Sequence, residues 1–140
     1  MYPHKKTFPL AAAAFAILVA AVLVVGAAAA PDPFKGTWYA TDIDGSNQTL
    51  RIGGGPGNSY HVRYYDDGAT ICGWTSGASG PAASANGSLS ALGNELSGNL
   101  PVYCLTSPRS QYDDDFPFVF TYDPGTDTMT GLGAPEPWHH

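Results

Sequence analysis

Charged residues are scarce in this sequence, at 13% of its 140 residues. Beyond the first thirty residues, apolar side chains also lack a helical spacing that lasts three turns. Many Tyr, Thr, Gly and Asn residues stand in their place, and they favour short strands and turns over helices. The 17 glycines and 12 prolines suit a disordered chain, but the Trp, Tyr and Phe residues can bury enough apolar area to offset the chain entropy. The composition therefore predicts an all-β domain.

Basic residues are the scarcest charged class. Beyond residue 30, only Lys35, Arg51, Arg63 and Arg109 remain against all twelve acidic residues, which gives this part a net charge of −8. Negative charge repels the phosphates of nucleic acids and anionic lipids. We therefore expect no nucleic-acid partner, and no membrane contact except through the N-terminal segment.

Cysteine is almost absent, with only Cys72 and Cys104. Neither has a histidine or a second cysteine at metal-ligand spacing, so a metal site at these positions is not indicated. An isolated pair in an exported chain predicts a Cys72–Cys104 disulfide. Closing a loop of this length stabilises a domain by about 3 to 4 kcal/mol.

The first thirty residues have the pattern of a targeting segment. Lys5 and Lys6 precede residues 11–30, which carry no charge and end in small side chains. The pattern predicts a signal peptide over residues 1–30 and a single domain over residues 31–140, secreted or otherwise extracytoplasmic. The alternative is an uncleaved hydrophobic helix that anchors the domain to the membrane.

Short alternating segments separated by turn residues predict about eight strands. Their predicted ranges are 36–41, 47–53, 59–66, 69–74, 83–89, 91–105, 116–122 and 127–132. Tight turns between them indicate an antiparallel meander, which we expect to close into a small barrel. A two-sheet β-sandwich is the alternative. Residues 75–82 and 106–115 are predicted to be loops.

The start of the predicted domain, Phe34-Lys35-Gly36-Thr37-Trp38-Tyr39, resembles the calycin superfamily. Lipocalins open their first strand with Gly-x-Trp, and avidin-type barrels open with Gly-Thr-Trp-Tyr. The resemblance implies a cup-shaped barrel in which Trp38 points inward and plugs one end. The chain departs from lipocalins because it has no late helix pattern and no arginine after Arg109.

Two acidic stretches are candidate metal sites. Asp42, Asp44, Ser46 and Asn47 alternate as in a calcium loop, but position twelve would be Gly53, where a glutamate is needed. We therefore predict a polar hairpin turn there. The run from Asp113 to Asp115 is interpreted as a solvated loop, so no metal and no cofactor are predicted.

Catalytic residues in a recognisable arrangement are missing. The predicted domain has one internal histidine, His61, and no Gly-x-Ser-x-Gly motif. The pair Asp66–Asp67 lies in a turn sequence, where aspartate is common for backbone reasons. We therefore expect a protein that is not an enzyme.

Aromatic side chains are the best candidates for ligand binding. Alternation places a set of them on the inner face, where they line a pocket or form the core: Trp38, Tyr60, Tyr64, Phe118 and Phe120. A second set is expected to face outward: Tyr39, Tyr65, Trp74 and Tyr103. The first set predicts non-catalytic binding of a small apolar or mixed ligand. The second set supports the alternative, a cell-envelope or extracellular interaction domain that binds protein or carbohydrate. An open interior favours the first function, and a filled interior favours the second.

Overall fold

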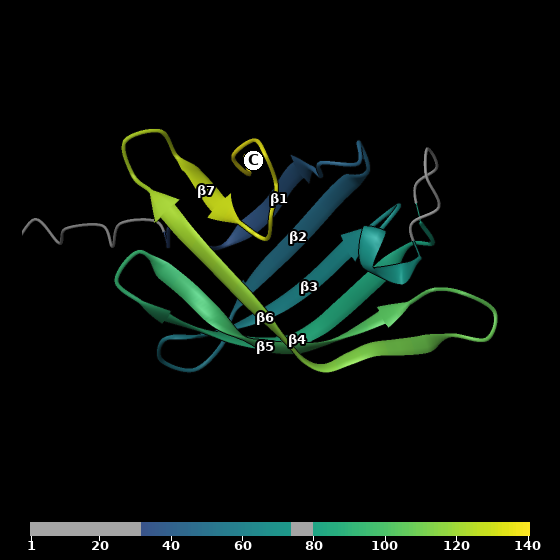
Figure 1. Ribbon diagram of the computed structural model, residues 1–140. Coiled ribbons are helices and arrows are strands. Elements are labelled where there is room, and N and C mark those ends of the chain that lie inside the picture. The colour runs from purple at the N-terminus through teal and green to yellow at the C-terminus, as the bar shows by residue number, and fades with distance from the viewer. Residues whose placement is uncertain (1–31, 74–79) are drawn as a thin grey trace, which may run out of the picture. The chain divides into compact units, whose positions relative to one another are not determined.

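Seven antiparallel strands form one curled sheet in the computed structural model, which describes residues 32–73 and 80–140 and leaves out the side chains of residues 113 and 114. The strands are β1 (Gly36–Thr41), β2 (Asn47–Gly54), β3 (Ser59–Asp66), β4 (Ala83–Leu92), β5 (Glu95–Cys104), β6 (Ser110–Asp123) and β7 (Thr128–Gly131). They are hydrogen-bonded in sequence order, so the sheet is an antiparallel meander. Figure 1 shows that it curls into a half-barrel with one hollow side.

Strand alternation produces the inner face of the half-barrel. In β2 and β3, buried and exposed side chains follow one another with a period of two. Every strand contributes apolar side chains to one core, and the fully buried large ones are Trp38, Trp138, Phe34, Phe118, Phe120, Leu50, Leu89, Leu96, Leu100, Met129, Val62 and Val102. Residues 31–140 form one compact unit around this core.

The C-terminal tail connects the two edges of the meander. Tyr39 in β1 donates its backbone N–H to the carbonyl of His139 over 2.8 Å and accepts one in return over 3.1 Å. On the other side, Met129 in β7 and Trp138 exchange the same pair of bonds over 3.0 and 2.7 Å. Figure 1 shows the tail between β7 and β1. The tail therefore supplies hydrogen-bond partners to both edge strands.

Three strand predictions need correction. Residues 69–74 are not a strand where the structure describes them, because the N–H groups of Cys72 and Gly73 bond back three residues to Ala69 and Thr70, forming a 3₁₀ turn (Thr70–Cys72). The predicted loop at 106–115 is half strand, because β6 begins at Ser110 and pairs there with the end of β5. The segment 91–105 is divided by a turn, so β4 reaches Leu92 and β5 begins at Glu95.

Other predictions are confirmed, or they concern residues outside the described ranges. The all-β antiparallel meander is confirmed, with seven strands in place of about eight. Trp38 points inward, as predicted. The signal peptide or hydrophobic helix over residues 1–30, and the outward-facing Trp74, lie outside the described residues. Within residues 32–73 and 80–140, no helix has the length and apolar character needed to cross a membrane.

Candidate functional site

The inner aromatic residues divide between two ends of the half-barrel. Trp38 and Phe120 have no exposed surface, so both are core residues. Tyr60 lies beside Phe34, with ring centroids 5.5 Å apart. Tyr64 and Phe118, which contact each other at 5.4 Å, line a hollow at the other end. The structure thus brings two of the five predicted ligand-binding residues to one cavity.

We call the first of these regions the plugged end, and it comprises Phe34, Trp38, Tyr60 and Tyr122. Trp38 donates its indole N–H to the carbonyl of Phe34 over 2.9 Å. Tyr122 packs edge-on against both Phe34 and Trp38. These ring contacts pack the aromatic side chains of this end against one another.

A partly exposed carboxylate fastens the plugged end to the chain before β1. The Tyr60 hydroxyl donates to Asp32 over 2.9 Å, and Lys35 lies 3.3 Å from the same carboxylate. Burial would raise the pKa of Asp32, but hydrogen bonds from Tyr60 and the Phe34 backbone, together with Lys35, outweigh it and lower the pKa. Asp32 therefore favours its charged form in the folded chain.

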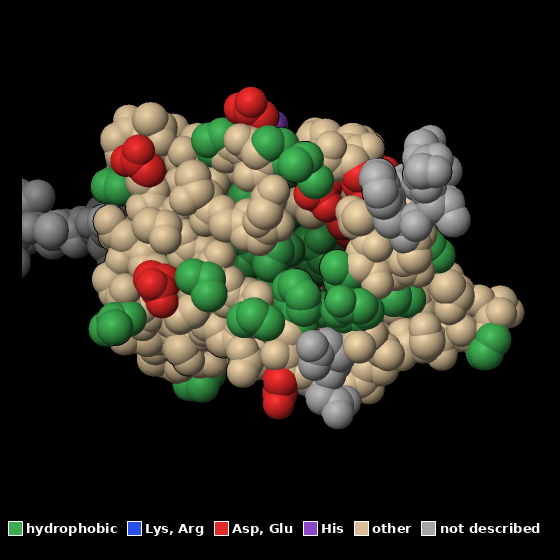
Figure 2. Space-filling model, in the orientation of Figure 1, with side chains coloured by type: hydrophobic (Ala, Val, Ile, Leu, Met, Phe, Trp, Pro, Cys, Tyr) green, Lys and Arg blue, Asp and Glu red, His purple; other side chains and the backbone are tan. Residues whose placement is uncertain are grey.

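The second region, the open end, contains a cavity of about 70 Å³. Figure 2 shows a recess floored by apolar side chains, with acidic side chains at its rim. β1–β3 and the segments beside them supply the polar side of the cavity, whereas the 3₁₀ turn, β5, β6 and the segment after β7 supply most of its apolar side. The lining residues are Asp42, Gln48, Tyr64, Asp66, Ala69, Thr70, Ile71, Val102, Phe116, Phe118 and Leu132.

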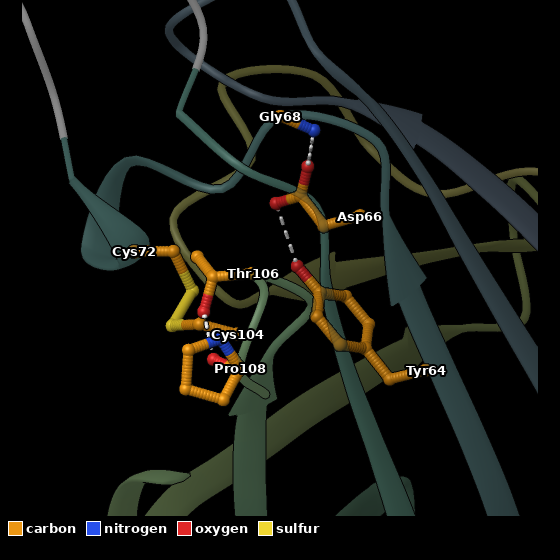
Figure 3. The surroundings of a disulfide bond; sticks show 7 residues. All are labelled: Tyr64, Asp66, Gly68, Cys72, Cys104, Thr106 and Pro108. Carbon is orange, nitrogen blue, oxygen red and sulfur yellow. Dashed lines mark hydrogen bonds between the residues drawn. A yellow bond between two sulfur atoms is a disulfide. The ribbon is translucent and has the colours of Figure 1, made fainter. Parts of the chain in front are cut away.

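Asp66 is the centre of the polar side of this cavity. It is 2% exposed, and its carboxylate accepts the Tyr64 hydroxyl and the Gly68 backbone N–H, each over 3.0 Å. Figure 3 shows both bonds beside the disulfide. Gln48, directly opposite on β2, donates its side-chain N–H to Asp66 over 3.4 Å. Burial, followed by the charge of Asp66, raises the pKa of Tyr64, so its hydroxyl stays a donor at neutral pH.

Only one of the two polar ends of the Gln48 side-chain amide has a hydrogen-bond partner. Its side chain is 2% exposed, and its carbonyl oxygen Oε1 has no hydrogen-bond partner. Exchanging the amide oxygen and nitrogen would bring an oxygen against the Asp66 carboxylate, so the chemistry supports the orientation in which nitrogen faces Asp66. The cavity therefore contains a buried acceptor with no donor among the described residues.

The calcium-like stretch forms the predicted hairpin turn between β1 and β2. Backbone bonds from Asp42 to Ser46 and from Gly45 to Asp42 close it. The Thr70 hydroxyl donates a hydrogen bond to Asp44 over 2.7 Å. Asp44 is not one of the residues that line the cavity. Burial would raise the pKa of Asp44, but hydrogen bonds from Ser46 and Thr70 outweigh it and lower the pKa.

Asp42 lies at the cavity and accepts the backbone N–H of its neighbour Ile43 over 2.6 Å, a bond that does not outweigh burial. Partial burial raises the pKa of Asp42, and the negative charges of Asp44 and Asp66 raise it further. Within the described ranges, no basic side chain lies at ion-pair distance from Asp42 or Asp66. The open end is therefore a negatively charged recess without its own counterion.

Asp66 and Gln48 were not recognised from the sequence as site residues. Asp66 ends the predicted strand 59–66, and the pair Asp66–Asp67 was interpreted as a turn sequence, where aspartate is common for backbone reasons. Its position in β3 is nevertheless even-numbered, like the inward-facing Val62 and Tyr64, and the same parity places Gln48 beside Leu50 on the inner face of β2. Strand parity was the signal that could have found both.

The predicted disulfide lies next to the open end. Cys72 in the 3₁₀ turn and Cys104 at the end of β5 are bonded, with their Cα atoms 5.4 Å apart. Figure 3 shows this bond near the Tyr64–Asp66 pair. It ties the 3₁₀ turn, which lines the cavity, to the sheet.

The outer face of the sheet carries most of the basic charge. Arg51 in β2 and Arg63 in β3 are exposed and directly opposite each other in the register. Neither lies within ion-pair distance of a carboxylate in the part of the chain that the structure describes. On the face shown in Figure 2, no described basic side chain is in view. The exposed arginines of β2 and β3 therefore lie on a different side from the acidic rim of the recess.

Tyrosines accompany these arginines. The neighbouring row across the sheet contains Tyr39, Tyr65 and Tyr103, and the first two are 48% and 45% exposed. The guanidinium of Arg109 lies 4.2 Å from the centre of the Tyr103 ring, in cation–π geometry. The outward orientation predicted for Tyr39 and Tyr65 is confirmed.

Three open hollows on this face share Arg63. They measure about 480, 230 and 380 Å³, and Arg51 lines the first two of them. The third runs past Tyr65 to Tyr103 and Arg109. We call this surface, which comprises Arg51, Arg63, Tyr65, Tyr103 and Arg109, the arginine–tyrosine face.

Other candidate chemistry is sparse. His61 is an exposed residue, as expected, with its Nδ1 3.3 Å from the Ser88 hydroxyl. Among the residues that the structure describes, no group of three or more His, Cys, Asp and Glu side chains is placed to hold a metal ion.

No family model matches this chain, and no curated protein and no solved structure matches it either. The calycin relationship therefore stays a prediction that rests on residues 34–39 and the strand order.

Proposed function

We propose that this chain is an extracytoplasmic binding domain whose arginine–tyrosine face binds a carbohydrate that carries carboxylates. The observation that carries the proposal is the pair Arg51 and Arg63, directly opposite each other without a carboxylate partner in the described residues. Like charges at directly opposite positions destabilise a sheet. A bound anion offsets that repulsion, whereas the folded chain alone gains nothing from it.

The chemistry of the face fits an acidic sugar. A guanidinium binds a carboxylate through two parallel hydrogen bonds. Tyr65 and Tyr103 present apolar ring faces with a polar hydroxyl, which suit a sugar ring with its C–H face and its hydroxyl edge. The three adjoining hollows extend the surface beyond one sugar unit.

The charge of the whole domain narrows the ligand class. A net charge of −8 beyond residue 30 opposes a dense polyanion such as DNA, which has one charge per about 1.7 Å of helix. An acidic polysaccharide spreads its charge more widely, so the local arginines can compensate for the repulsion. The Cys72–Cys104 disulfide supports an oxidising compartment.

Filling of the interior also favours a surface function. Trp38, Phe118 and Phe120 have no exposed surface, and the 70 Å³ cavity is far below the roughly 300 Å³ of a pocket for a drug-sized ligand. The predicted binding of a small ligand is thereby restricted to the open end.

Calorimetric titration with polygalacturonate, using dextran as the neutral comparison, tests the proposal. We expect binding of polygalacturonate only, and weaker binding as salt is added. Arg63→Gln should weaken it about tenfold or more, since a hydrogen bond to a charged group contributes about 1.5 to 3 kcal/mol. Lys35→Gln is the matched control, because it removes the same charge from a residue paired with Asp32.

The melting temperature of each variant distinguishes a loss of binding from a loss of folding in this test. Arg63→Gln should leave the melting temperature unchanged or raise it, because it removes the repulsion of Arg51. Equal binding of dextran, or equal affinity of Arg63→Gln and Lys35→Gln, would refute the proposal.

A further inference from the structure

The open end has the hydrogen-bond acceptors of a cation site. None of these acceptors belongs to the arginine–tyrosine face. Asp42, Asp66 and Gln48 line the cavity, and the carbonyl oxygen Oε1 of Gln48 is buried without a hydrogen-bond partner. Gln48 and Asp66 are each only 2% exposed. A buried acceptor left without a donor is costly to a fold, so its presence here points to a donor that arrives from outside the chain.

We propose that the open end binds a primary ammonium group on a short alkyl chain. An ammonium group has three N–H donors, and three of the residues that line the cavity, Asp42, Asp66 and Gln48, carry two carboxylates and one unpartnered amide oxygen as acceptors for them. The alkyl carbons then lie against Phe116 and Phe118 on the apolar side.

The size of the cavity limits the alkyl chain. A water-sized group needs about 10 to 15 Å³ of such volume, so 70 Å³ admits about five non-hydrogen atoms. That is one nitrogen and about four carbons, with any remainder of the ligand outside the mouth.

A divalent metal fits the open end less well. Calcium takes six to eight oxygen ligands, whereas the cavity offers two carboxylates and one amide oxygen above an apolar floor. A guanidinium group is planar and needs a flatter set of acceptors. The combination of two carboxylates, one amide oxygen and an apolar floor matches the alkylammonium ion best.

An NMR titration of the full oxidised chain tests this site with n-butylammonium chloride at constant ionic strength. We expect saturable shifts in the backbone signals of Asp42, Gln48, Asp66 and Thr70. Butanol, which has the same size and no charge, should bind at least tenfold more weakly. Butanol binding equal to that of n-butylammonium would overturn the proposal, as would shifts spread over the whole surface without saturation.

Two variants of equal charge supply the control. Asp42→Asn should weaken n-butylammonium binding about tenfold, because it removes one acceptor charge from the cavity. Asp123→Asn makes the same change in net charge at a residue that does not line the cavity, the last residue of β6, where its carboxylate accepts the Gly125 backbone N–H, and it should leave binding unchanged. Equal affinity of the two variants would show that only net charge matters, against the proposal.

A lysine side chain of a partner protein has the same chemistry as a free alkylamine. Titration with Nα-acetyl-lysine methylamide distinguishes these sources. If Nα-acetyl-lysine methylamide binds as tightly as n-butylammonium, the site is assigned to a partner's lysine. If it does not bind, the site is assigned to a free amine.

Discussion

The two ends of the half-barrel are built from related residues in different ways. At the plugged end, Tyr60 donates to Asp32, which is partly exposed and accompanied by Lys35. At the open end, Tyr64 donates to Asp66, which is buried and has no basic neighbour at ion-pair distance in residues 32–73 and 80–140. One tyrosine–aspartate pair completes a packed aromatic cluster, and the other borders a cavity. The comparison indicates that the plugged end contributes to the stability of the fold, and we propose that the open end serves recognition.

Removal of Trp38 should have the largest effect on this comparison. Trp38→Ala deletes a fully buried ring and its bond to Phe34, so we expect a loss of about 3 to 5 kcal/mol in the free energy of unfolding. Tyr65→Ala, on the outer face, should change it by less than about 0.5 kcal/mol. Urea unfolding measures both. A stable Trp38→Ala variant would show that the plug does not hold the fold together.

Loss of the disulfide should be the next largest change, and it acts on the open end. The double variant Cys72→Ser/Cys104→Ser should lose about 3 to 4 kcal/mol, because a loop across a sequence separation of 32 is no longer closed in the unfolded chain. Urea unfolding of this variant and the oxidised parent measures the loss. A difference below about 1 kcal/mol would mean that the 3₁₀ turn and β5 stay together without the bond.

Deleting one hydroxyl from each tyrosine compares the two ends directly. Tyr64→Phe removes one of the three hydrogen-bond donors to the buried Asp66 carboxylate and leaves those from Gly68 and Gln48, so we expect a loss of about 1 to 3 kcal/mol. Tyr60→Phe leaves Asp32 accessible to water and paired with Lys35, so its loss should stay below about 1 kcal/mol. Thermal unfolding of both variants measures the two losses of stability, so that they can be compared. Equal losses would contradict the difference in burial on which the comparison depends.

The carboxylates at the two ends should give the smallest effects, with opposite signs. The pKa of Asp42 is raised from 3.8 in the folded chain, so the folded state binds a proton more tightly than the unfolded state. Its contribution to the free energy of unfolding therefore falls as pH rises from 3.8 through the raised pKa. Asp42→Asn should stabilise the chain at neutral pH by less than about 1 kcal/mol after solvent screening.

Asp32 has a lowered pKa, so its contribution is present above pH 3.8 and is lost as pH falls through the lowered pKa. Asp32→Asn should therefore destabilise the chain at neutral pH, in contrast to Asp42→Asn. Melting temperatures of both variants from pH 3 to pH 7 measure the two contributions. A shift of the same sign for both variants would contradict the assignment.

The strands were largely predictable because their side chains alternate. Residues 36–41 and 59–66 have the predicted bounds, since apolar and polar positions change with a period of two in both. Residues 69–74 have the same strand-like composition, but backbone bonds to Ala69 and Thr70 and the Asp44–Thr70 contact hold residues 70–72 in a 3₁₀ turn. Such tertiary contacts leave no periodicity in the sequence.

The sites were less predictable than the fold. The partners Gln48 and Asp66 are 18 positions apart and meet only through the β2–β3 register. The same register places Arg51 opposite Arg63, so both candidate sites depend on strand pairing rather than on a local motif. Among the predicted ligand residues, alternation could place Trp38 and Phe118 inward, but it could not say which of them borders empty space.

The tail that bonds to both β1 and β7 has a consequence for the order of folding. Tyr39 and His139 are about a hundred positions apart in the sequence, whereas every strand of the meander pairs with its neighbour in the chain. Local pairings form quickly, and closing a long loop costs more entropy. We therefore infer that the hairpins form first and the tail docks late. Until it docks, β1 and β7 each keep a row of unpaired backbone groups that another chain can use. During synthesis, the chain is exposed to aggregation until residues 138 and 139 are available.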